Sequence, residues 1–369
     1  MSRLDELIKE FCPNGVEYKK IKQVYKRLKG TPITAGKMKE IDNPNGEIRI
    51  FAGGKTVINA MEKDITNANI TRVPAVLVQS RGVIDVVYYD KPFTFKNEMW
   101  AYTHEDKTSV KYLFYVLKNN MQEFRDAASG MGSLPQISLK VTEDFKIPLP
   151  PLPVQQEIVR ILDNFTELTA ELTAELTARR KQYEYYRDLL LTFGDDISWC
   201  NLEEILKIRN GKDYKSFNVG NIPVYGSGGI MTYIDTYAYD KPSVLIPRKG
   251  SIDKLYYVEK PFWTVDTIFY TEIYTSKVIP KYVFYCLQKE RLEQYNTAGG
   301  VPSLTQTVLN KVKIPVPPIE EQERIVAILD RFDALCNDLT CGLPAEIEAR
   351  QKQYEYYRDK LLSFKEVTA

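Results

Sequence analysis

Residues 155–193 read QQEIVRILDNFTELTAELTAELTARRKQYEYYRDLLLTF and decide how the rest of the chain is interpreted. No glycine or proline interrupts them, and the strong helix formers Ala, Glu, Leu, Arg and Gln dominate. A helix over this stretch would be roughly 55 to 60 Å long at 1.5 Å per residue. Its apolar residues recur at steps of three and four and form one stripe, which comprises Ile158, Ile161, Leu162, Phe165, Leu168, Leu172, Leu176, Tyr183, Tyr186 and Leu190. A rod of this length cannot bury the stripe against itself, so the sequence predicts a partner helix.

A second copy of the stretch provides that partner. Three segments return in the same order: residues 146–152 at 313–319, residues 158–163 at 325–330, and QYEYYRD of 182–188, letter for letter, at 353–359. A period of about half the chain indicates an internal duplication and not a solenoid. The second copy contains Gly342-Leu343-Pro344, which predicts a break or kink in its helix.

The segments before each rod share one plan of strand-like and helix-like stretches. Matching positions are residues 48–51 with 222–225, 81–85 with 249–253, 112–115 with 282–285, and 133–136 with 303–306. We therefore predict an α+β fold in which two α/β domains are joined by two long antiparallel coiled-coil helices, with an internal pseudo-two-fold duplication. The predicted boundaries are 1–150 for the first domain with a short N-terminal helix, 151–194 for the central helical region, 195–317 for the second domain and 318–369 for the C-terminal helical region.

Composition narrows the class of protein. The 369 residues are 44% hydrophobic, enough for two or three domains with real cores. Lys and Arg number 50 against 49 Asp and Glu, and the net charge of only +1 argues against a bulk polyanion binder. No apolar run reaches membrane-spanning length and no signal peptide precedes the first helix, so we expect a cytoplasmic protein with no membrane partner. The five cysteines are odd in number and form no CxxC, which predicts free thiols in a reducing compartment and no metal site.

The sequence contains no recognisable catalytic constellation. His104 is its only histidine, and a lone histidine in an aromatic-rich stretch is more often structural than catalytic. Residues 53–56 (GGKT) resemble the end of a phosphate-binding loop, but Arg49 stands where that loop needs its first glycine. Residues 226–229 (GSGG) begin like a dinucleotide fingerprint, with Met231 in place of the last glycine. We predict a non-catalytic protein that uses no cofactor and no metal.

Loops that mix Arg, Lys, Gln, Ser, Gly and Tyr are the remaining functional candidates. Arg and Lys can bridge guanine O6 and N7, Gln can bridge adenine, and small residues let the backbone approach phosphate. An ordinary solvated surface is the alternative for any one loop, and the prediction of DNA binding rests on the recurrence of these loops in both halves. The predicted DNA-binding residues are Arg27, Lys29, Lys55, Gln79, Ser80, Arg81, Lys212, Tyr225, Ser227, Arg248, Lys249 and Ser251.

Three marks together resemble the specificity subunits of type I restriction-modification systems. They are the duplicated QYEYYRD, the proline-rich entries that lead into residues 155–157 and 321–323, and the Thr-Ala-Glu-Leu tetrads at 169–172 and 173–176, which resemble those of the IC subgroup. The resemblance covers essentially the whole chain. It implies two target-recognition domains that each read one half of a bipartite, asymmetric site on double-stranded DNA. It also implies two modification (methyltransferase) subunits and two restriction (motor-nuclease) subunits as partners, to which adenine methylation, ATP use and DNA cleavage belong.

Polar letters shared by both rods predict the surface on which the modification subunits dock. A helical pair needs only its inner stripe for mutual packing, and a merely solvated face tolerates drift between copies. The predicted partner-binding residues are Gln155, Gln156, Gln182, Arg187, Gln322, Gln353 and Arg358. The alternative function is that of a structural coiled-coil adaptor whose two globular domains bind other proteins or glycans.

Overall fold

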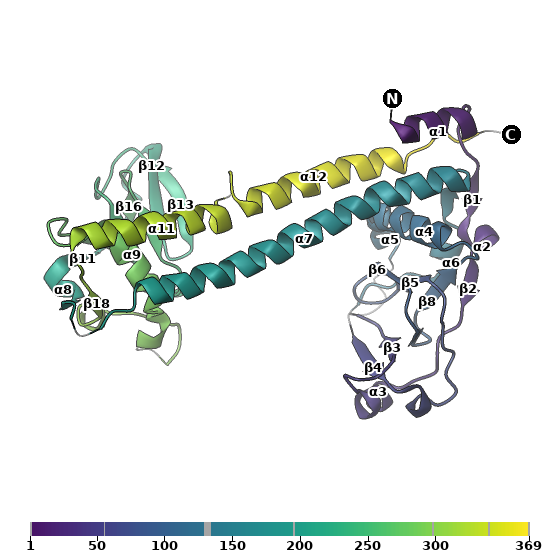
Figure 1. The fold of residues 1–369 in the computed structure, drawn as a ribbon, viewed down its shortest axis with the longest axis horizontal. Helices are drawn as coiled ribbons and strands as arrows, with labels where there is room; N and C mark the ends of the chain where they lie inside the picture. Colours follow the sequence, from purple (N-terminus) through teal and green to yellow (C-terminus); the bar gives the residue numbers. More distant parts are fainter. Residues whose placement is uncertain are drawn as a thin grey trace. The chain divides into compact units, whose positions relative to one another are not determined.

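The computed structural model describes residues 2–54, 56–128, 134–194, 196–296, 299–338 and 340–367. It divides into two compact units (Figure 1). Unit 1 comprises Met1–Glu171 and Ile347–Ala369, and unit 2 comprises Leu172–Glu346. Each unit contains one globular domain together with the parts of the long helices that pack on it. The predicted α+β class, with two α/β domains and two helical regions, is confirmed.

The domain of unit 1 is built from three small sheets. A four-stranded sheet has the order β2 (Lys26–Leu28), β8 (Trp100–Thr103), β5 (Ala75–Gln79), β6 (Asp85–Tyr89). A three-stranded sheet has the order β4 (Val57–Ala60), β3 (Ile48–Phe51), β7 (Phe93–Phe95). In the third sheet, β1 (Tyr18–Lys20) pairs with β9 (Lys146–Pro148). Its helices are α1 (Arg3–Phe11), α2 (Ile21–Val24), α3 (Ala35–Ile41), η1 (Glu62–Asp64), α4 (Lys107–Asn119), α5 (Met121–Asp126) and α6 (Leu139–Glu143).

The central strand β5 shows why this domain is layered. All five of its residues are buried. Alternate side chains point to opposite faces of the sheet, so both faces must be covered. Val76 and Val78 belong to the core that includes α4 and the long helix α7 (Leu152–Leu190). Ala75 and Leu77 belong to a second core with phenylalanines of β3 and β7. The four-stranded sheet therefore lies between α4 on one face and the three-stranded sheet on the other.

Unit 2 repeats the three sheets of this plan strand by strand. Its sheets have the orders β11 (Leu206–Asn210), β17 (Ile268–Ile273), β14 (Ser243–Pro247), β15 (Tyr256–Val258); then β13 (Gly229–Ile234), β12 (Val219–Gly226), β16 (Trp263–Thr264); and β10 (Trp199–Asn201) with β18 (Lys313–Pro315). Its domain helices are α8 (Leu202–Ile205), α9 (Pro280–Lys289), η2 (Leu292–Tyr295) and α10 (Gln306–Leu309). Helix α9 packs on β14 as α4 packs on β5. Residues 211–218, all of them described, contain no counterpart of α3.

Each unit contains a short antiparallel pair of helices. In unit 1, α7 packs against α12 (Leu343–Leu361), and the ring of Phe165 stacks on Tyr357 at a centroid distance of 5.7 Å. In unit 2, α7 packs against α11 (Ile319–Asn337), and Tyr186 stacks on Phe332 at 5.6 Å. The two stacks are copies of each other, because Phe165 and Phe332 occupy the same place in the repeat, as do Tyr186 and Tyr357.

The predicted break in the second rod is confirmed. Helix α11 ends at Asn337 and α12 begins at Leu343, just before Pro344. A Cβ on Gly342 would lie 2.5 Å from the Ala334 carbonyl oxygen, so only glycine lets the chain turn this tightly against the end of α11.

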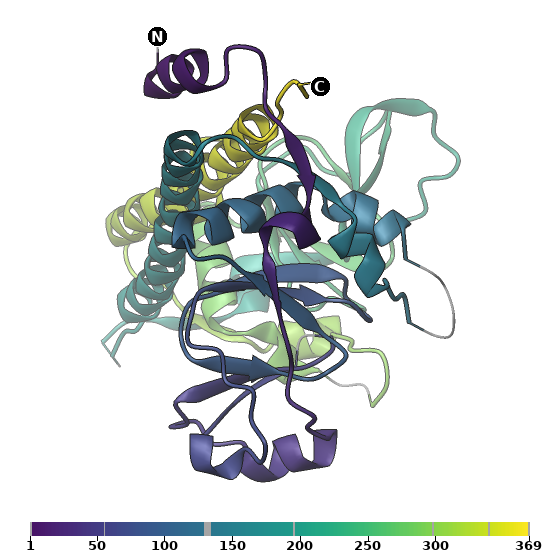
Figure 2. The ribbon, with the colours of Figure 1, turned by 90° about the vertical axis from the view of Figure 1, so that its right-hand side faces the viewer.

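Residues from the two ends of the sequence meet in unit 1, as Figure 2 shows. The Val16 N–H donates to the Lys365 carbonyl at 2.8 Å, and the Val367 N–H donates to the Val16 carbonyl at 3.0 Å. The Tyr18 hydroxyl donates to the Phe364 carbonyl at 3.0 Å. The predicted N-terminal helix is α1, and Ser2 caps it in a reciprocal pair of hydrogen bonds with Asp5. The C-terminal segment thus closes onto the first domain.

Candidate nucleic-acid interface

Backbone hydrogen bonds in unit 1 hold two segments together beside the β3–β4 turn. The Ile137 N–H donates to the Ser80 carbonyl at 3.0 Å, and the Gly82 N–H donates to the Pro135 carbonyl at 2.9 Å. Gly82 has φ +78°, a left-handed conformation that favours glycine. A Cβ on Gly82 would lie 4.0 Å from Gly54 of the β3–β4 turn. Three loops that are far apart in sequence therefore converge.

The same three loops converge in unit 2. The Leu304 N–H donates to the Arg248 carbonyl at 2.9 Å, and the Gly250 N–H donates to the Pro302 carbonyl at 3.0 Å. Gly250 has φ +85° and lies beside Ser227 of the β12–β13 turn. These bonds make Ser80, Arg81 and Val83 equivalent to Arg248, Lys249 and Ser251, so the predicted match of 81–85 with 249–253 is confirmed.

The predicted match of residues 133–136 with 303–306 is wrong. The backbone bonds align Pro135 with Pro302 and Ile137 with Leu304, a shift of three residues. Residue 133 itself lies outside the described residues. The similar residues of the two loops suggested a wrong alignment, because short polar loops resemble one another in composition. Hydrogen bonds to the neighbouring loop set the true register.

The predicted DNA-binding residues differ in exposure. Five of them are exposed and could contact DNA directly: Arg27, Lys29, Arg81, Lys212 and Lys249. Four are half-buried at the edges of the loops: Tyr225, Ser227, Arg248 and Ser251. Lys55 lies outside the described residues.

Two predicted contacts need correction, because the structure buries them. Gln79 and Ser80 are 6% and 1% exposed. The Ser80 hydroxyl donates to the Glu98 carbonyl at 2.6 Å and so holds the β5–β6 loop against the segment that leads into β8. Both side chains belong to the scaffold of the site and are not available to a base edge.

The exposed residues of unit 1 surround two hollows on either side of residues 96–100. A hollow of about 650 Å³ is lined by Gly53, Gly54, Arg81, Gly82, Val83, Lys96, Glu98 and Leu134. A second hollow of about 530 Å³ is lined by Arg27, Leu28, Lys29, Gly30, Pro32, Asn69, Asn97, Met99, Trp100 and Leu139. The structure therefore groups Arg27 with Lys29, and places Arg81 with Lys96 and Glu98. Sequence reasoning missed Lys96 and Glu98, because no motif marks them.

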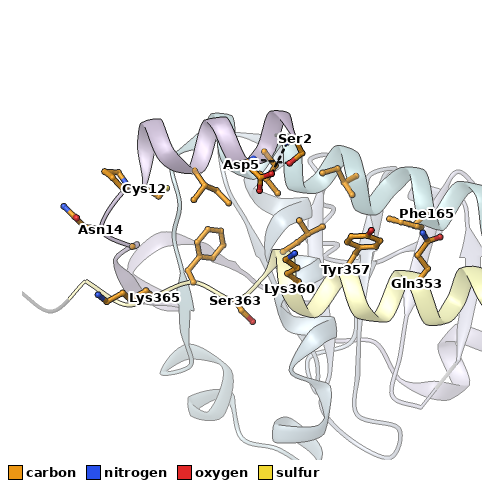
Figure 3. A pocket seen from close by; sticks show the side chains of 17 residues that line it. Ser2, Asp5, Cys12, Asn14, Phe165, Gln353, Tyr357, Lys360, Ser363 and Lys365 are labelled. Atoms are coloured by element: carbon orange, nitrogen blue, oxygen red, sulfur yellow. Dashed lines mark hydrogen bonds between the residues drawn. The ribbon is translucent and has the colours of Figure 1, made fainter.

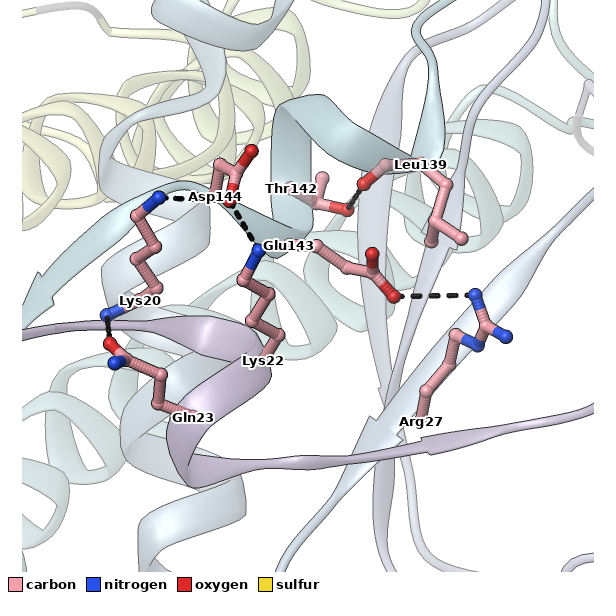
Figure 4. A network of polar contacts seen from close by, with 8 residues as sticks. All are labelled: Lys20, Lys22, Gln23, Arg27, Leu139, Thr142, Glu143 and Asp144. Atoms are coloured by element: carbon pink, nitrogen blue, oxygen red, sulfur yellow. Dashed lines mark hydrogen bonds and ion pairs between the residues drawn. The ribbon is translucent and has the colours of Figure 1, made fainter.

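Arg27 takes part in a network of ion pairs at the edge of the domain (Figure 4). Its Nη1 lies 3.2 Å from Glu143 Oε1. The neighbouring Asp144 lies 2.8 Å from Lys22 Nζ and 3.1 Å from Lys20 Nζ. Hydrogen bonds from Lys22 and then Lys20 lower the pKa of Asp144 to about 2. Solvated pairs of this kind are weak, so Arg27 can exchange Glu143 for a phosphate at small cost.

In unit 2 aromatic rings support the candidate residues. The Arg248 guanidinium lies 5.7 Å from the centre of the Phe269 ring. Tyr225 packs against Tyr256 at 6.0 Å, and burial raises the pKa of Tyr225. The Lys212 carbonyl accepts a bond of 2.9 Å from the Trp263 indole, and Lys212 is exposed.

The described residues contain no group of three or more side chains that could hold a metal ion. His104 Nδ1 accepts a bond of 3.0 Å from the Asp106 N–H, and its ring lies 5.6 Å from that of Tyr25. This contact stabilises the turn that begins α4. Within the described part of the chain, no helix is both long and apolar enough to cross a membrane.

Three predicted partner-binding residues on the rods are also buried, Gln155, Gln322 and Arg187, and none of them belongs to the exposed docking surface. Gln155 is 4% exposed; its Oε1 accepts from the Ser109 hydroxyl at 3.0 Å and its Nε2 donates to the Pro150 carbonyl at 2.7 Å. Gln322 is fully buried; its Oε1 accepts from the Ile279 N–H at 2.8 Å and its Nε2 donates to the Pro317 carbonyl at 2.9 Å. Both glutamines attach a domain to its rod, so we remove them from the predicted docking surface.

The repeated QYEYYRD motif turns its arginine inward and its second tyrosine outward. Arg187 is 8% exposed, lies 2.8 Å from Asp188 and covers the Tyr183 ring at 5.8 Å. Arg358 is half-buried and makes the same two contacts, with Asp359 and Tyr354. Tyr185 and Tyr356, by contrast, are 64% and 63% exposed.

The other predicted docking residues lie at or near the surface. Gln156 is exposed, whereas Gln182 and Gln353 are half-buried and accept hydrogen bonds from Arg179 and Arg350 at 2.9 and 3.0 Å. Gln353 and Tyr357 line a hollow of about 750 Å³ that also involves α1 and Phe364 (Figure 3). The docking residues were predicted because the same polar residues occur in both copies of the motif. That criterion does not show that Tyr185 is exposed and Arg187 is buried.

Comparison with known proteins decides the family. The family described as "Type I restriction modification DNA specificity domain" matches residues 13–179 and 195–349, which covers both domains. The chain belongs to this family. It is therefore a specificity subunit, a class that carries DNA sequence specificity and is not itself catalytic. The family assignment does not support the alternative of a structural adaptor for proteins or glycans.

Curated relatives agree with the assignment. The specificity subunit is 37% identical over 297 residues to the "Type I restriction enzyme EcoR124I/EcoR124II specificity subunit" of Escherichia coli, over 70% of this chain and 72% of that protein. It is 34% identical to the "Putative type I restriction enzyme specificity subunit S.HindORF215P" of Haemophilus influenzae, over 72% of this chain and 77% of that protein.

Solved structures share the fold. The S subunit of a type I restriction-modification system from M. genitalium superposes with a TM-score of 0.63 at 19% identity, over 96% of this chain and 98% of that one. A chain from a structure titled for complex assembly and conformational transition of the type I R-M system gives 0.53 at 15% identity, over 95% and 98%. At these identities the likeness concerns the fold of the specificity subunit alone.

Proposed function

We propose that each globular domain reads one half of a bipartite, asymmetric site on double-stranded DNA through its cluster of three loops. The observation that supports this is the repetition of one backbone cluster with different side chains. Ser80, Arg81 and Val83 in the first domain correspond to Arg248, Lys249 and Ser251 in the second. Arg81 and Lys249 are exposed, whereas the buried Ser80 and the apolar Val83 stand where the second domain has the half-buried Arg248 and Ser251. A shared scaffold with different side chains is what two half-sites of different sequence require, because base edges are distinguished by donor and acceptor patterns.

The helical regions then dock the other subunits of a type I restriction-modification complex. The motif QYEYYRD occurs twice, and in both copies its glutamate and second tyrosine are exposed: Glu184 and Tyr185 in α7, and Glu355 and Tyr356 in α12. Large exposed aromatic residues are common anchors at protein interfaces. Two docking surfaces with the same exposed glutamate and tyrosine favour two modification subunits, and DNA cleavage would need two restriction subunits besides. Such a complex acts on DNA in the cytoplasm.

A domain exchange tests the proposal. Residues 17–147 are replaced by the matching domain of a relative with a different target, and methylated positions are mapped in cells that supply the modification subunit. We expect one half-site to change and the other to remain. A change in both half-sites, or in neither, would contradict the proposal. Replacing residues 197–313 instead is the reciprocal control, and it should change only the other half-site.

A further inference from the structure

A carboxylate and an ammonium group lie side by side in the larger loop hollow of the first domain. Lys96 Nζ is 3.0 Å from Glu98 Oε1, and the two side chains are 22% and 34% exposed. Both line the hollow with Arg81 and the glycines of the β3–β4 turn. A Cβ placed on Gly53 would lie 3.5 Å from Glu98 Oε1, so glycine leaves the space in front of the carboxylate open.

The second domain shows that the fold does not need this pair. The Lys96 N–H donates to the Phe51 carbonyl and the Met99 N–H to the Lys96 carbonyl; in the second domain Val265 and Ile268 make the same bonds with Tyr225 and Val265. Lys96 and Glu98 therefore correspond to Val265 and Thr267. The same backbone turn forms there with a buried valine and a neutral threonine. An ion pair that the scaffold does not require is available for recognition.

A carboxylate is a costly group to place on a surface that faces phosphates. Like charges a few ångströms apart repel, and excluding water strengthens the repulsion. A carboxylate gains energy from DNA where it accepts from the amino group of cytosine N4 or adenine N6 in the major groove. The adjacent ammonium group suits the acceptor beside that amino group, which is guanine O6 across a G·C pair or N7 on adenine.

We propose that Lys96 and Glu98 form a base-reading pair of the first domain, in which Glu98 accepts from an exocyclic amino group and Lys96 donates to the neighbouring base acceptor. The inference rests on the proposed function and names a residue pair that determines part of the first half-site. A cytosine or an adenine amino group would satisfy it, and the base that the experiment identifies distinguishes them.

The decisive variant replaces the pair by the residues of the second domain, Lys96→Val with Glu98→Thr, which removes no net charge. The full subunit, assembled with its modification subunit, is tested on a library with both half-sites randomised. We expect discrimination at one base pair of the first half-site to fall by about tenfold to a hundredfold. Relaxation of a C or G requirement identifies cytosine as the partner of Glu98, and relaxation of an A or T requirement identifies adenine.

A single variant separates reading from charge. Glu98→Leu removes one negative charge and both acceptor oxygens, so binding to non-specific DNA should become tighter while discrimination at the same base pair falls. The control is Glu17→Gln, which breaks an ion pair of the same length, 3.0 Å to Lys19, beside β1 and outside the loops. The control should leave both half-sites unchanged.

Unchanged recognition at every position in the Lys96→Val, Glu98→Thr variant would overturn the inference. Uniform weakening across all sequences would also overturn it, because that pattern indicates phosphate contact or lost structure. In either case, intact reading of two half-sites would leave the proposed function standing. Loss of specificity in both half-sites of a folded variant would count against the proposed function itself.

Discussion

The Tyr115 hydroxyl of α4 donates a hydrogen bond of 2.5 Å to the Asp163 carboxylate of α7. Lys111 lies 2.8 Å from the same carboxylate. Tyr285 and Lys281 of α9 make the same contacts to Asp330 of α11, at 2.5 and 3.0 Å. Asp163 and Asp330 are the last letters of the repeated segment at 158–163 and 325–330. The repeated aspartate therefore joins each domain to its own rod.

Removing one hydroxyl should weaken the joint in its own unit. Tyr115→Phe or Tyr285→Phe loses a partly buried hydrogen bond to a charged group, and we expect the free energy of unfolding to fall by about 1.5–3 kcal/mol. Urea unfolding at neutral pH measures this. Tyr185→Phe, at a residue 64% exposed, is the matched control and should change stability by less than about 0.5 kcal/mol. Equal effects at all three tyrosines would contradict this role.

These tyrosines also predict a loss of stability in alkali. Burial first, and then the hydrogen bond to the aspartate, raise the pKa of Tyr115 and of Tyr285 above the ordinary value. Because the folded pKa is the higher one, the contribution to stability is complete below about pH 10 and is lost as the pH rises above it. Unfolding measured from pH 8 to 12 should show no difference in slope below about pH 10 and, above it, a slope shallower by up to about 1.4 kcal/mol per pH unit for each Tyr→Phe change. An unchanged slope would refute the assignment.

Two glycines should be intolerant of a methyl group. A Cβ on Gly30 would lie 2.6 Å from the Phe95 carbonyl oxygen, and one on Gly211 would lie 2.0 Å from that of Val265. We expect Gly30→Ala and Gly211→Ala each to destabilise by about 1–3 kcal/mol, because the adjacent strand must move. Gly36→Ala is the control: it meets nothing within 4 Å in α3 and should stabilise by roughly 0.8–1 kcal/mol through helix propensity. Thermal unfolding of the three variants provides the comparison.

The docking surface should tolerate change without loss of the fold. Glu184→Lys with Tyr185→Ala, and the copies Glu355→Lys with Tyr356→Ala, alter exposed side chains. We expect each pair to weaken capture of the modification subunit by tenfold or more while unfolding stays unchanged. Arg187→Glu is a contrasting variant, because Arg187 is 8% exposed and covers a ring, so it should lower stability first. Capture at wild-type strength by both altered pairs would contradict the surface.

The tetrads of α7 should set the gap between the half-sites. Leu172 and Leu176 are half-buried, and the three residues between them are exposed. One more tetrad adds about 6 Å and overshoots a full turn by about 40°; one base pair rises about 3.4 Å and turns about 35°. Insertion of Thr-Ala-Glu-Leu after Leu176 should keep both half-sites and lengthen the gap by one or two base pairs, as methylation mapping would show. Insertion of two residues should abolish activity, because it turns the leucines away from the stripe. An unchanged gap after a whole tetrad would refute the ruler.

Sequence reasoning succeeded where short-range rules decide the structure. The helix α7 is predicted by leucines at helical spacing in a stretch without glycine. The interruption between α11 and α12 is predicted by Gly342-Leu343-Pro344. The short helix predicted at the N-terminus is α1, which Ser2 and Asp5 cap. The family followed from the resemblance of the repeated QYEYYRD, the proline-rich entries and the tetrads to those of known specificity subunits, and the family match confirms it.

Only part of the candidate site could be predicted from the sequence. Gln79, Ser80, Gln155 and Gln322 have the side chains of surface residues, and the structure buries all four against backbone groups or in the core. The sequence contains no motif that predicts the ion pair between Lys96 and Glu98, because a lysine and a glutamate two residues apart are common in surface loops.

By itself, the sequence determined the helices, the duplication and the class of protein, since these depend on local spacing and on letters compared with letters. Only the tertiary structure decided which loops converge, and therefore which side chains share a surface. The reason is that Gly82 donates to the Pro135 carbonyl, and Gly250 to the Pro302 carbonyl, through backbone hydrogen bonds that any residue can accept and any residue but proline can donate. Contacts between main-chain groups carry no side-chain signature, so they become visible only when the strands are in place.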